Sequence, residues 1–422
     1  MIISAGVPLT LAVAHSAVRR KLPFAQDSAI GGRRKQPWVS ALLLTCLYWL
    51  FAGPALLLAV LSLRGERKRS AYVQRRLAQT ATTLPPATVI VPVKGFDEGL
   101  RENLAALAAL DYPDYELIVA AQAAGDIPSG VLPVRCKVVL APGIMPDSSE
   151  KVQNLLGAVR AARKRTQVFA FADSDGRPTP GWLRALVTPL EDPGVGAVTG
   201  YRWFLPDPSD FWSLMRGVWD AVAAGTLGAG NNRFVWGGAM AIRKEFFFEA
   251  RVPEFWQGAL SDDYALSEAV HAAGQSIAYA PGALTPCGEH ISCSRFFGWI
   301  RRQMAITRVY APRLWWPGLI AHIFYCGGMA VSLVASFRGH RLAEWALLAQ
   351  LLPGMIKGMN RAALAKESLP EHAGWFKRHG WVHAIWVPLA TWVWLIALAS
   401  SAFARTIEWR GRVYALRRDQ RM

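Results

Sequence analysis

The chain has 422 residues, of which 52% are hydrophobic and 18 are Trp, and its formal net charge is +17. This composition is too apolar for an ordinary soluble enzyme, and Trp concentrates at membrane–water boundaries because its ring is apolar while its N–H is polar. The charge is typical of a nucleic-acid-binding protein or of a protein resting on anionic lipid headgroups. Many basic residues flank apolar segments, at 64–76 and 405–421, so we expect an anionic membrane surface as a partner and no nucleic acid.

Residues 1–37 are interpreted as an N-terminal extension, because their apolar run precedes its basic cluster, the reverse of a secretory signal. Residues 38–63 contain no charged side chain. This length exceeds the roughly 20 residues that a membrane-spanning helix needs. Basic residues lie on both sides, but those at 64–76 favour a cytoplasmic catalytic domain, at the inner membrane in a bacterium.

Residues 85–292 alternate short apolar runs with amphipathic stretches, which is typical of a mixed α/β domain with parallel strands. The expected strands are 88–92, 115–121, 137–140, 168–172 and 196–199. The expected helices are 99–110 and 151–164.

Residues 293–312 interleave aromatic side chains with Arg, which predicts an amphipathic helix in the membrane interface. Two or three transmembrane segments follow within 313–404. The middle apolar stretch, 342–355, is interrupted by Pro353-Gly354 and also fits a re-entrant segment. Residues 405–422 form a basic tail. Three crossings would place that tail opposite the catalytic domain, against the positive-inside rule, so the number of crossings stays open.

Asp173 and Asp175 follow the expected strand 168–172 directly. The ligand crevice of an α/β sheet lies beyond the carboxyl ends of its strands. Carboxylates at that position can hold Mg²⁺ or Mn²⁺, and the cation can neutralise charge on a departing diphosphate. We therefore predict a metal site here; the alternative is a solvated loop end.

Two further segments contain residues that could take part in a reaction. Asp262 and Asp263 precede an expected helix, where carboxylates commonly cap free N–H groups; alternatively, Asp263 is the general base that deprotonates an acceptor hydroxyl. Arg302 has the planar fork suited to a diphosphate, although anchoring to the membrane is a competing role.

The five Cys are irregularly spaced and are interpreted as reduced thiols. Cys287 and Cys293, with His290 between them, match no usual zinc spacing, so we expect no zinc site there.

In this order, these elements resemble family 2-type glycosyltransferases, and most closely the ceramide glucosyltransferase group (family 21) with its bacterial lipid-glycosylating relatives. The resemblance extends from about residue 85 to 415. Its elements are 90–95 (IVPVKG), Asn103-Leu104, 110–116, 151–155, Asp173-Ser174, 237–240, Arg243-Lys244, Asp262-Asp263-Tyr264 and 407–414 (IEWRGRVY).

The resemblance implies a GT-A-type domain with N- and C-terminal transmembrane helices. It also implies inverting transfer from UDP-glucose or a similar UDP-hexose to the hydroxyl of a ceramide-like lipid, diacylglycerol or hopanoid. Lys94 and Asp126 would lie near the nucleotide, and Lys151, Asp262 and Gln303 would contribute to substrate binding.

Two departures from the group's pattern affect this interpretation. Asp126 is the only Asp within 122–128, where the group has its base-contacting aspartate, and Gln303 stands where relatives have the Trp that lines the acceptor tunnel. A processive polysaccharide synthase shares the aspartates but needs an enclosed channel and, typically, that Trp. A non-catalytic transporter or scaffold with a degenerate nucleotide-binding domain is the alternative from another class, and the retained aspartates argue against it.

Overall fold

A computed structural model describes residues 37–416, apart from 142, 144–147, 229 and 231–233. The predicted extension, residues 1–37, and the end of the predicted tail, residues 417–422, therefore lie almost wholly outside the described residues. The chain divides into two units, 1–45 and 46–422. Helix α1 (Pro37–Leu63) begins in the first unit, and the description below concerns the second.

A seven-stranded sheet in the order β3-β2-β1-β4-β6-β5-β7 forms the centre of this unit. Its strands are β1 (Ala87–Pro92), β2 (Tyr115–Ala121), β3 (Lys137–Leu140), β4 (Val168–Ala172), β5 (Val195–Phe204), β6 (Ala239–Arg243) and β7 (Ser276–Cys287). The fold is thus mixed α/β with a mainly parallel sheet, as predicted. Among these strands only β6 is antiparallel to its neighbours, β4 and β5. Neither β6 nor β7 was among the expected strands, and the direction of β6 could not be predicted, because a short buried apolar run does not reveal it.

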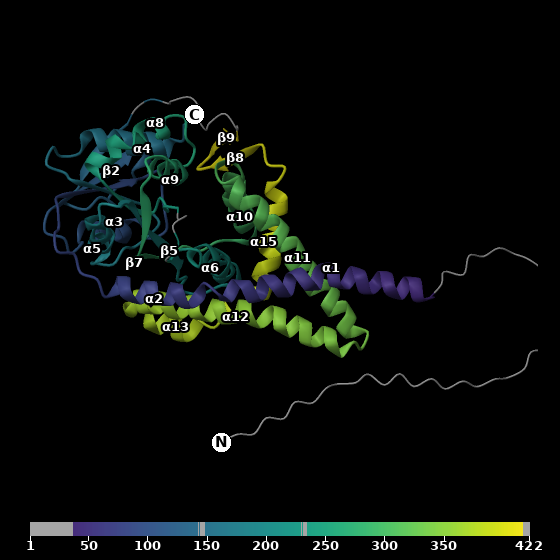
Figure 1. Ribbon diagram of the computed structural model, residues 1–422. Coiled ribbons are helices and arrows are strands. Elements are labelled where there is room, and N and C mark those ends of the chain that lie inside the picture. The colour runs from purple at the N-terminus through teal and green to yellow at the C-terminus, as the bar shows by residue number, and fades with distance from the viewer. Residues whose placement is uncertain (1–36, 142, 144–147, 229, 231–233, 417–422) are drawn as a thin grey trace, which may run out of the picture. The chain divides into compact units, whose positions relative to one another are not determined.

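Both faces of the sheet are covered by helices, which explains why its strands are apolar on both sides. One face packs against α4 (Glu150–Ala161), α7 (Lys244–Glu249), α8 (Val252–Trp256) and α9 (Asp262–Ala272). The other packs against α2 (Glu66–Leu77), α3 (Leu100–Ala108), α5 (Trp182–Val187) and α6 (Phe211–Ala224) (Figure 1). Short 3₁₀ turns lie at η1 (Ala124–Asp126), η2 (Thr188–Glu191) and η3 (Pro370–His372).

The C-terminal part is helical and ends in a β-hairpin. Its elements are α10 (Cys293–Tyr310), α11 (Pro312–Phe337), α12 (Arg341–Ser368), α13 (Ala373–His379), α14 (Val382–Ile385), α15 (Val387–Ser401), β8 (Thr406–Trp409) and β9 (Arg412–Ala415). Helix α12 continues through Pro353-Gly354, so the predicted interruption there is wrong. Neighbouring helices stabilise such a helix around a proline; α12 packs closely on α14, where a Cβ on Gly358 would lie 1.7 Å from the carbonyl oxygen of His383.

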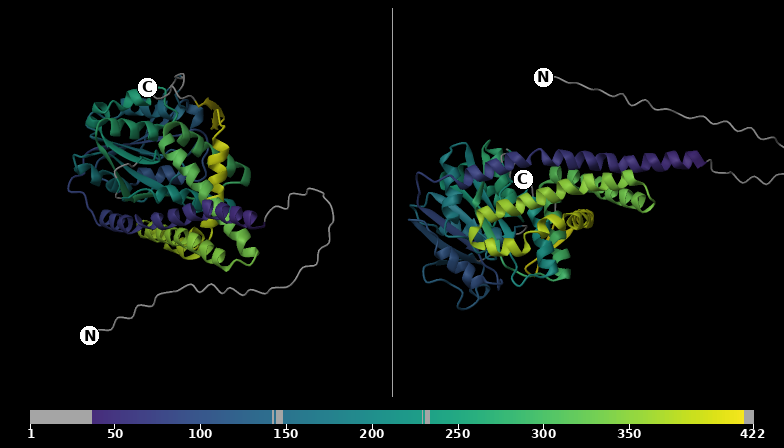
Figure 2. Two further views of the ribbon diagram at one scale, coloured as in Figure 1. Left: turned by 45° about the vertical axis from the view of Figure 1, so that its right-hand side comes forward. Right: turned by 90° about the horizontal axis from the view of Figure 1, so that it is seen from below.

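Within the described part of the chain, two helical stretches are long and apolar enough to cross a membrane, Leu44–Leu77 and α11. Helix α15 is apolar but spans only 15 residues. Helices α11 and α12 lie side by side (Figure 2). They expose large apolar side chains, including Phe337, Leu342 and Trp345. An exposed apolar surface of this kind is typical of contact with lipid.

Candidate active site

A cavity at the carboxyl ends of β1 and β4 contains every predicted site residue except Asp126. Its lining includes Lys94, Lys151, Asp173, Asp175, Asp262, Asp263, Arg302 and Gln303. Asp126 lies after β2, where its carbonyl oxygen accepts a hydrogen bond from the N–H of Gly95 at 2.7 Å. It therefore supports the turn next to Lys94 without lining the cavity.

Asp173 and Asp175 extend from the end of β4 into this cavity. Oδ1 of Asp175 is buried and has no hydrogen-bond partner among the described residues. Burial and the charge of Asp173 raise the pKa of Asp175 to about 7. An unpartnered buried carboxylate beside a second carboxylate fits a divalent cation. The described residues contain no group of three or more His, Cys, Asp or Glu side chains able to hold a metal ion. A cation at the Asp pair would therefore take its remaining ligands from phosphate oxygens and water.

Lys151, on α4, connects the two predicted carboxylate pairs. Its Nζ lies 2.7 Å from Oδ1 of Asp173 and 3.0 Å from Oδ2 of Asp262. Burial opposes the charge of this ammonium group, but the charges of Asp173 and Asp262 outweigh it and raise the pKa of Lys151. The contacts fix the start of α9 next to the end of β4, two elements that are remote in sequence.

Gly237 and Gly238 form the opposite wall of this ion-pair network. A Cβ on Gly237 would lie 2.5 Å from Oδ2 of Asp262, and one on Gly238 would lie 2.8 Å from Oδ2 of Asp173. Any side chain at these positions would displace the carboxylates. The two glycines are therefore required by the close approach of the backbone.

The two carboxylates of α9 differ in their surroundings. Asp262 is 4% exposed, and burial raises its pKa to about 6, although Lys151 opposes this shift. Asp263 is only partly buried. Its Oδ1 accepts hydrogen bonds from the N–H of Tyr264 at 2.8 Å and from Ser261, and its Oδ2 faces the N–H of Gly237 at 3.4 Å. Asp262 is thus held in an ion pair, while Asp263 remains accessible to a hydroxyl in the cavity.

Three guanidinium groups gather near Asp175, and the sequence assigned a role to only one of them, Arg302. Burial, followed by the charges of Arg202 and Arg410, lowers the pKa of Arg302 to about 10. Arg202, on β5, forms two hydrogen bonds of 3.2 Å with Asp220. The three guanidinium groups thus lie on the same side of the cavity as Asp175. The planar fork of an arginine is suited to binding a phosphate group.

Arg202 was missed because an Arg in the middle of a strand resembles a surface residue in the sequence. Its guanidinium lies 5.0 Å from the ring centre of Trp299 and 5.4 Å from that of Trp236. Such cation–π contacts join residues from separate elements, and nothing in the local sequence indicates them.

A cluster of aromatic rings also lines the cavity. Trp219 on α6 stacks on Trp394 of α15 with ring centres 4.3 Å apart, and it meets Trp299 of α10 edge-on at 5.3 Å. All three rings line the cavity together with Phe234 and Ile306. The lining thus combines charged groups with an aromatic cluster.

The sequence profile of glycosyl transferase family 21 matches residues 47–422. Among solved structures, glucosyl-3-phosphoglycerate synthase from Mycobacterium tuberculosis in complex with phosphoglyceric acid is 16% identical, with 57% of this chain and 83% of that chain covered and a TM-score of 0.35. The same enzyme with Mn²⁺, UDP-glucose and phosphoglyceric acid is 16% identical, with 56% and 82% covered and a TM-score of 0.36. Likenesses this distant carry no argument about the site of this chain.

Proposed function

The chain belongs to glycosyl transferase family 21, and from that premise we propose that it transfers a hexose from a UDP-sugar to a hydroxyl of a membrane lipid. We expect the hexose to be glucose, the domain to be of the GT-A type and the reaction to invert the anomeric configuration. The observation that carries the proposal is the shared cavity, in which a carboxylate pair after β4, Asp263 of α9 and Arg302 of α10 converge.

On the donor side, Asp173 and Asp175 would hold Mg²⁺ or Mn²⁺, which supplies positive charge to the departing diphosphate. Arg302 binds the diphosphate oxygens through its planar fork. Lys151 holds Asp173 in position through the 2.7 Å ion pair, so that the carboxylate pair is preorganised before the donor arrives.

On the acceptor side, Asp263 accepts the proton of the lipid hydroxyl as its oxygen attacks the anomeric carbon. A single base with the leaving group opposite is sufficient for a direct displacement, and such a displacement inverts the configuration. The ion pair between Lys151 and Asp262 fixes the first turn of α9, so that Asp263 presents its carboxylate to the cavity.

A lipid acceptor is supported by the aromatic cluster in the cavity and by the position of that cluster. Trp299 and Trp394 belong to α10 and α15, and α11, which is long enough to span a membrane, begins two residues after α10 ends. A lipid in the bilayer could therefore present its hydroxyl to Asp263 from the side of this cluster. We place the catalytic domain at the cytoplasmic face, at the inner membrane in a bacterium.

Incubating the purified protein with several UDP-sugars and a total lipid extract, followed by lipid mass spectrometry, tests this proposal. We expect one added hexose per lipid. Asp263→Asn should abolish transfer while UDP still binds, whereas Glu268→Gln, on an exposed position of the same helix, should retain activity. A polymeric product would instead identify a polysaccharide synthase. If Asp263→Asn glycosylated lipid at the wild-type rate, Asp263 would not be the general base.

A further inference from the structure

The segment predicted to be a basic tail is part of the cavity wall. Strands β8 and β9 pair as an antiparallel hairpin. Ile407 is buried against Ala305 of α10, and Trp409, Arg410 and Tyr414 line the cavity. Residues 406–415 of the predicted basic tail are thus folded against the helix that carries Arg302.

The tip of this hairpin has an unusual backbone. Arg410 has a φ of +51° and Gly411 a φ of +75°. Glycine adopts this left-handed conformation readily, but a residue with a Cβ rarely does. Strained residues of this kind persist where the surrounding structure holds them and often lie at functional sites. The strained backbone at Arg410 therefore indicates that its side chain has a specific role.

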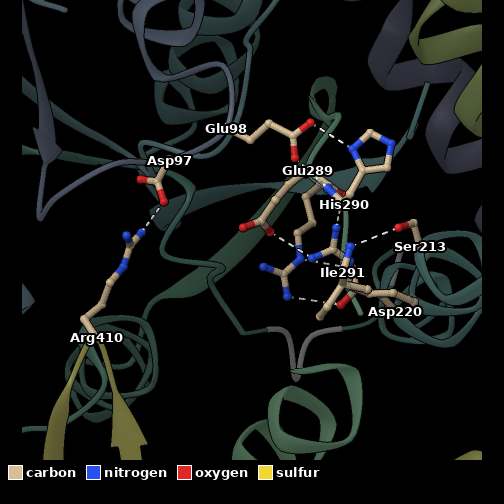
Figure 3. Close-up of polar contacts among 10 residues, drawn as sticks. Asp97, Glu98, Ser213, Asp220, Glu289, His290, Ile291 and Arg410 are labelled. Atoms are coloured by element: carbon tan, nitrogen blue, oxygen red, sulfur yellow. Dashed lines mark hydrogen bonds and ion pairs between the residues drawn. The ribbon is translucent and has the colours of Figure 1, made fainter. Parts of the chain in front are cut away.

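Arg410 reaches from the hairpin to the side of the cavity where Asp175 lies. Its Nη2 lies 2.5 Å from Oδ1 of Asp97 (Figure 3). Its Nη1 donates to the carbonyl oxygen of Lys94 at 3.1 Å. The other oxygen of Asp97 accepts a hydrogen bond from Oγ of Ser174 at 2.6 Å. Ser174 lies between Asp173 and Asp175. The guanidinium is thus linked through Asp97 to the carboxylate pair itself.

A second arginine of the hairpin anchors it beside the same strand ends. Nε of Arg412 lies 3.1 Å from Oε2 of Glu150, and its Nη2 donates to Oε1 of Gln122 at 2.8 Å. Glu150 also contacts Lys94. These contacts hold the hairpin over the ends of β1 and β2 and the start of α4, where a nucleotide would lie in a sheet of this kind.

Two arginines near the tip, Arg302 and Arg410, could donate to an anion in the cavity. Arg202 is committed to Asp220 by two hydrogen bonds, whereas the side chain of Arg410 is 34% exposed and retains free donors. Arg302 has no ion-pair partner within 4.0 Å among the described residues, and the positive charge of Arg410 acts on it. Both side chains line the same cavity, so a phosphate group bound there could accept hydrogen bonds from each of them.

We propose that Arg410 is a diphosphate-binding residue of the donor site, and that the hairpin closes this site over a nucleoside diphosphate. The inference rests on the function proposed above, because it assigns one more group to the same donor. It gives the hairpin a role in holding the leaving group, in addition to its packing on α10.

The test is the affinity of the purified full-length protein for UDP and for uridine, measured at saturating Mn²⁺ by isothermal titration and by competition. Arg410→Gly removes the guanidinium while allowing the left-handed turn. Loss of a charge-assisted hydrogen bond should raise the Kd for UDP on the order of tenfold to a hundredfold. The Kd for uridine, which has no phosphate, should change little. Arg405→Gly, an exposed position just before the hairpin, is the matched control and should bind UDP normally.

Asp97→Asn distinguishes binding of UDP by Arg410 from a merely structural role of Arg410. It breaks the ion pair between Asp97 and Arg410 but retains the guanidinium of Arg410. We expect this variant to bind UDP more tightly than Arg410→Gly does. Equal weakening of UDP and uridine in both variants would show that Arg410 only holds the Asp97 loop, and would overturn the inference. If the wild-type protein binds UDP and Arg410→Gly binds it with the same Kd, this inference is overturned while the proposed function stands. Absence of UDP binding in the wild-type protein would overturn the proposed donor as well.

Discussion

Replacing Lys151 by Met tests the ion-pair network that joins the two halves of the site. The side chain of Lys151 is 11% exposed and that of Asp262 is 6% exposed, so the substitution leaves a buried carboxylate without its countercharge. Breaking a buried pair in this way costs about 3–5 kcal/mol. The lower end of that range, about 3 kcal/mol, is expected because Asp173 is 24% exposed and is partly solvated.

Thermal unfolding in detergent, followed by Trp fluorescence, measures this loss. Chains of 150–250 residues lose roughly 2–4 °C in Tm per kcal/mol, and larger ones lose less, so we expect a fall of about 5 °C at pH 8. Lys164→Met, at an exposed position, should leave Tm unchanged.

The pH dependence of this effect has a definite sign. The folded-state pKa of Asp262 is already raised to about 6, and loss of Lys151 should raise it further. A carboxyl with a raised folded pKa contributes stability at low pH that is lost as the pH rises through the folded value. The cost of Lys151→Met should therefore be larger at pH 8 than at pH 5. Adding Asp262→Asn should recover part of the lost stability. The reasoning would be refuted if Lys151→Met had the same Tm as the wild type at pH 8. It would also be refuted if the Tm of the variant with both Lys151→Met and Asp262→Asn were lower than that of Lys151→Met.

Three other outcomes are expected. Asp175→Asn should weaken Mn²⁺ binding at least about tenfold in an electron paramagnetic resonance titration, because it removes one of two carboxylate ligands; an unchanged Kd would move the metal elsewhere. Gly238→Ala should lower stability by about 1–3 kcal/mol, because its Cβ would lie 2.2 Å from the ring of Trp236, whereas Gly288→Ala, with nothing within 4 Å, should not. The carbonyl of Pro208 and the carboxylate of Glu98 raise the pKa of His290, so the Tm advantage of the wild type over His290→Gln should be present below about pH 6.5 and vanish at higher pH; a constant difference would contradict this.

Several strands and the position of the carboxylate pair could be predicted because both depend on local sequence. The run 168–172 is apolar at every position, as a strand buried on both faces must be, and it coincides with β4. Two carboxylates directly after such a strand must lie at the ligand edge of the sheet. The predicted strands 115–121 and 137–140 likewise coincide with β2 and β3.

The missing parts of the site depend on contacts that are remote in sequence. Arg410 and Asp97 are 313 residues apart, and each looks like an ordinary surface residue in its own segment. The family resemblance indicated that 407–414 matters, but it gave no reason to place a C-terminal hairpin beside the first strand. Arg202 became part of the site only through Asp220 and the rings of Trp236 and Trp299.

The hairpin also limits the number of membrane crossings that the segment 312–404 could make. Residues 406–415 line the same cavity as α9 and α10, so the chain enters and leaves the segment 312–404 on one side of any bilayer that this segment crosses. Three crossings within 312–404 are incompatible with this shared cavity. A crossing by α11 requires a return within α12 to α15, and α12 alone is 28 residues long. An even number also places Arg405, Arg410 and Arg412 on the same side as the basic residues of 64–76, which is the arrangement that the positive-inside rule favours.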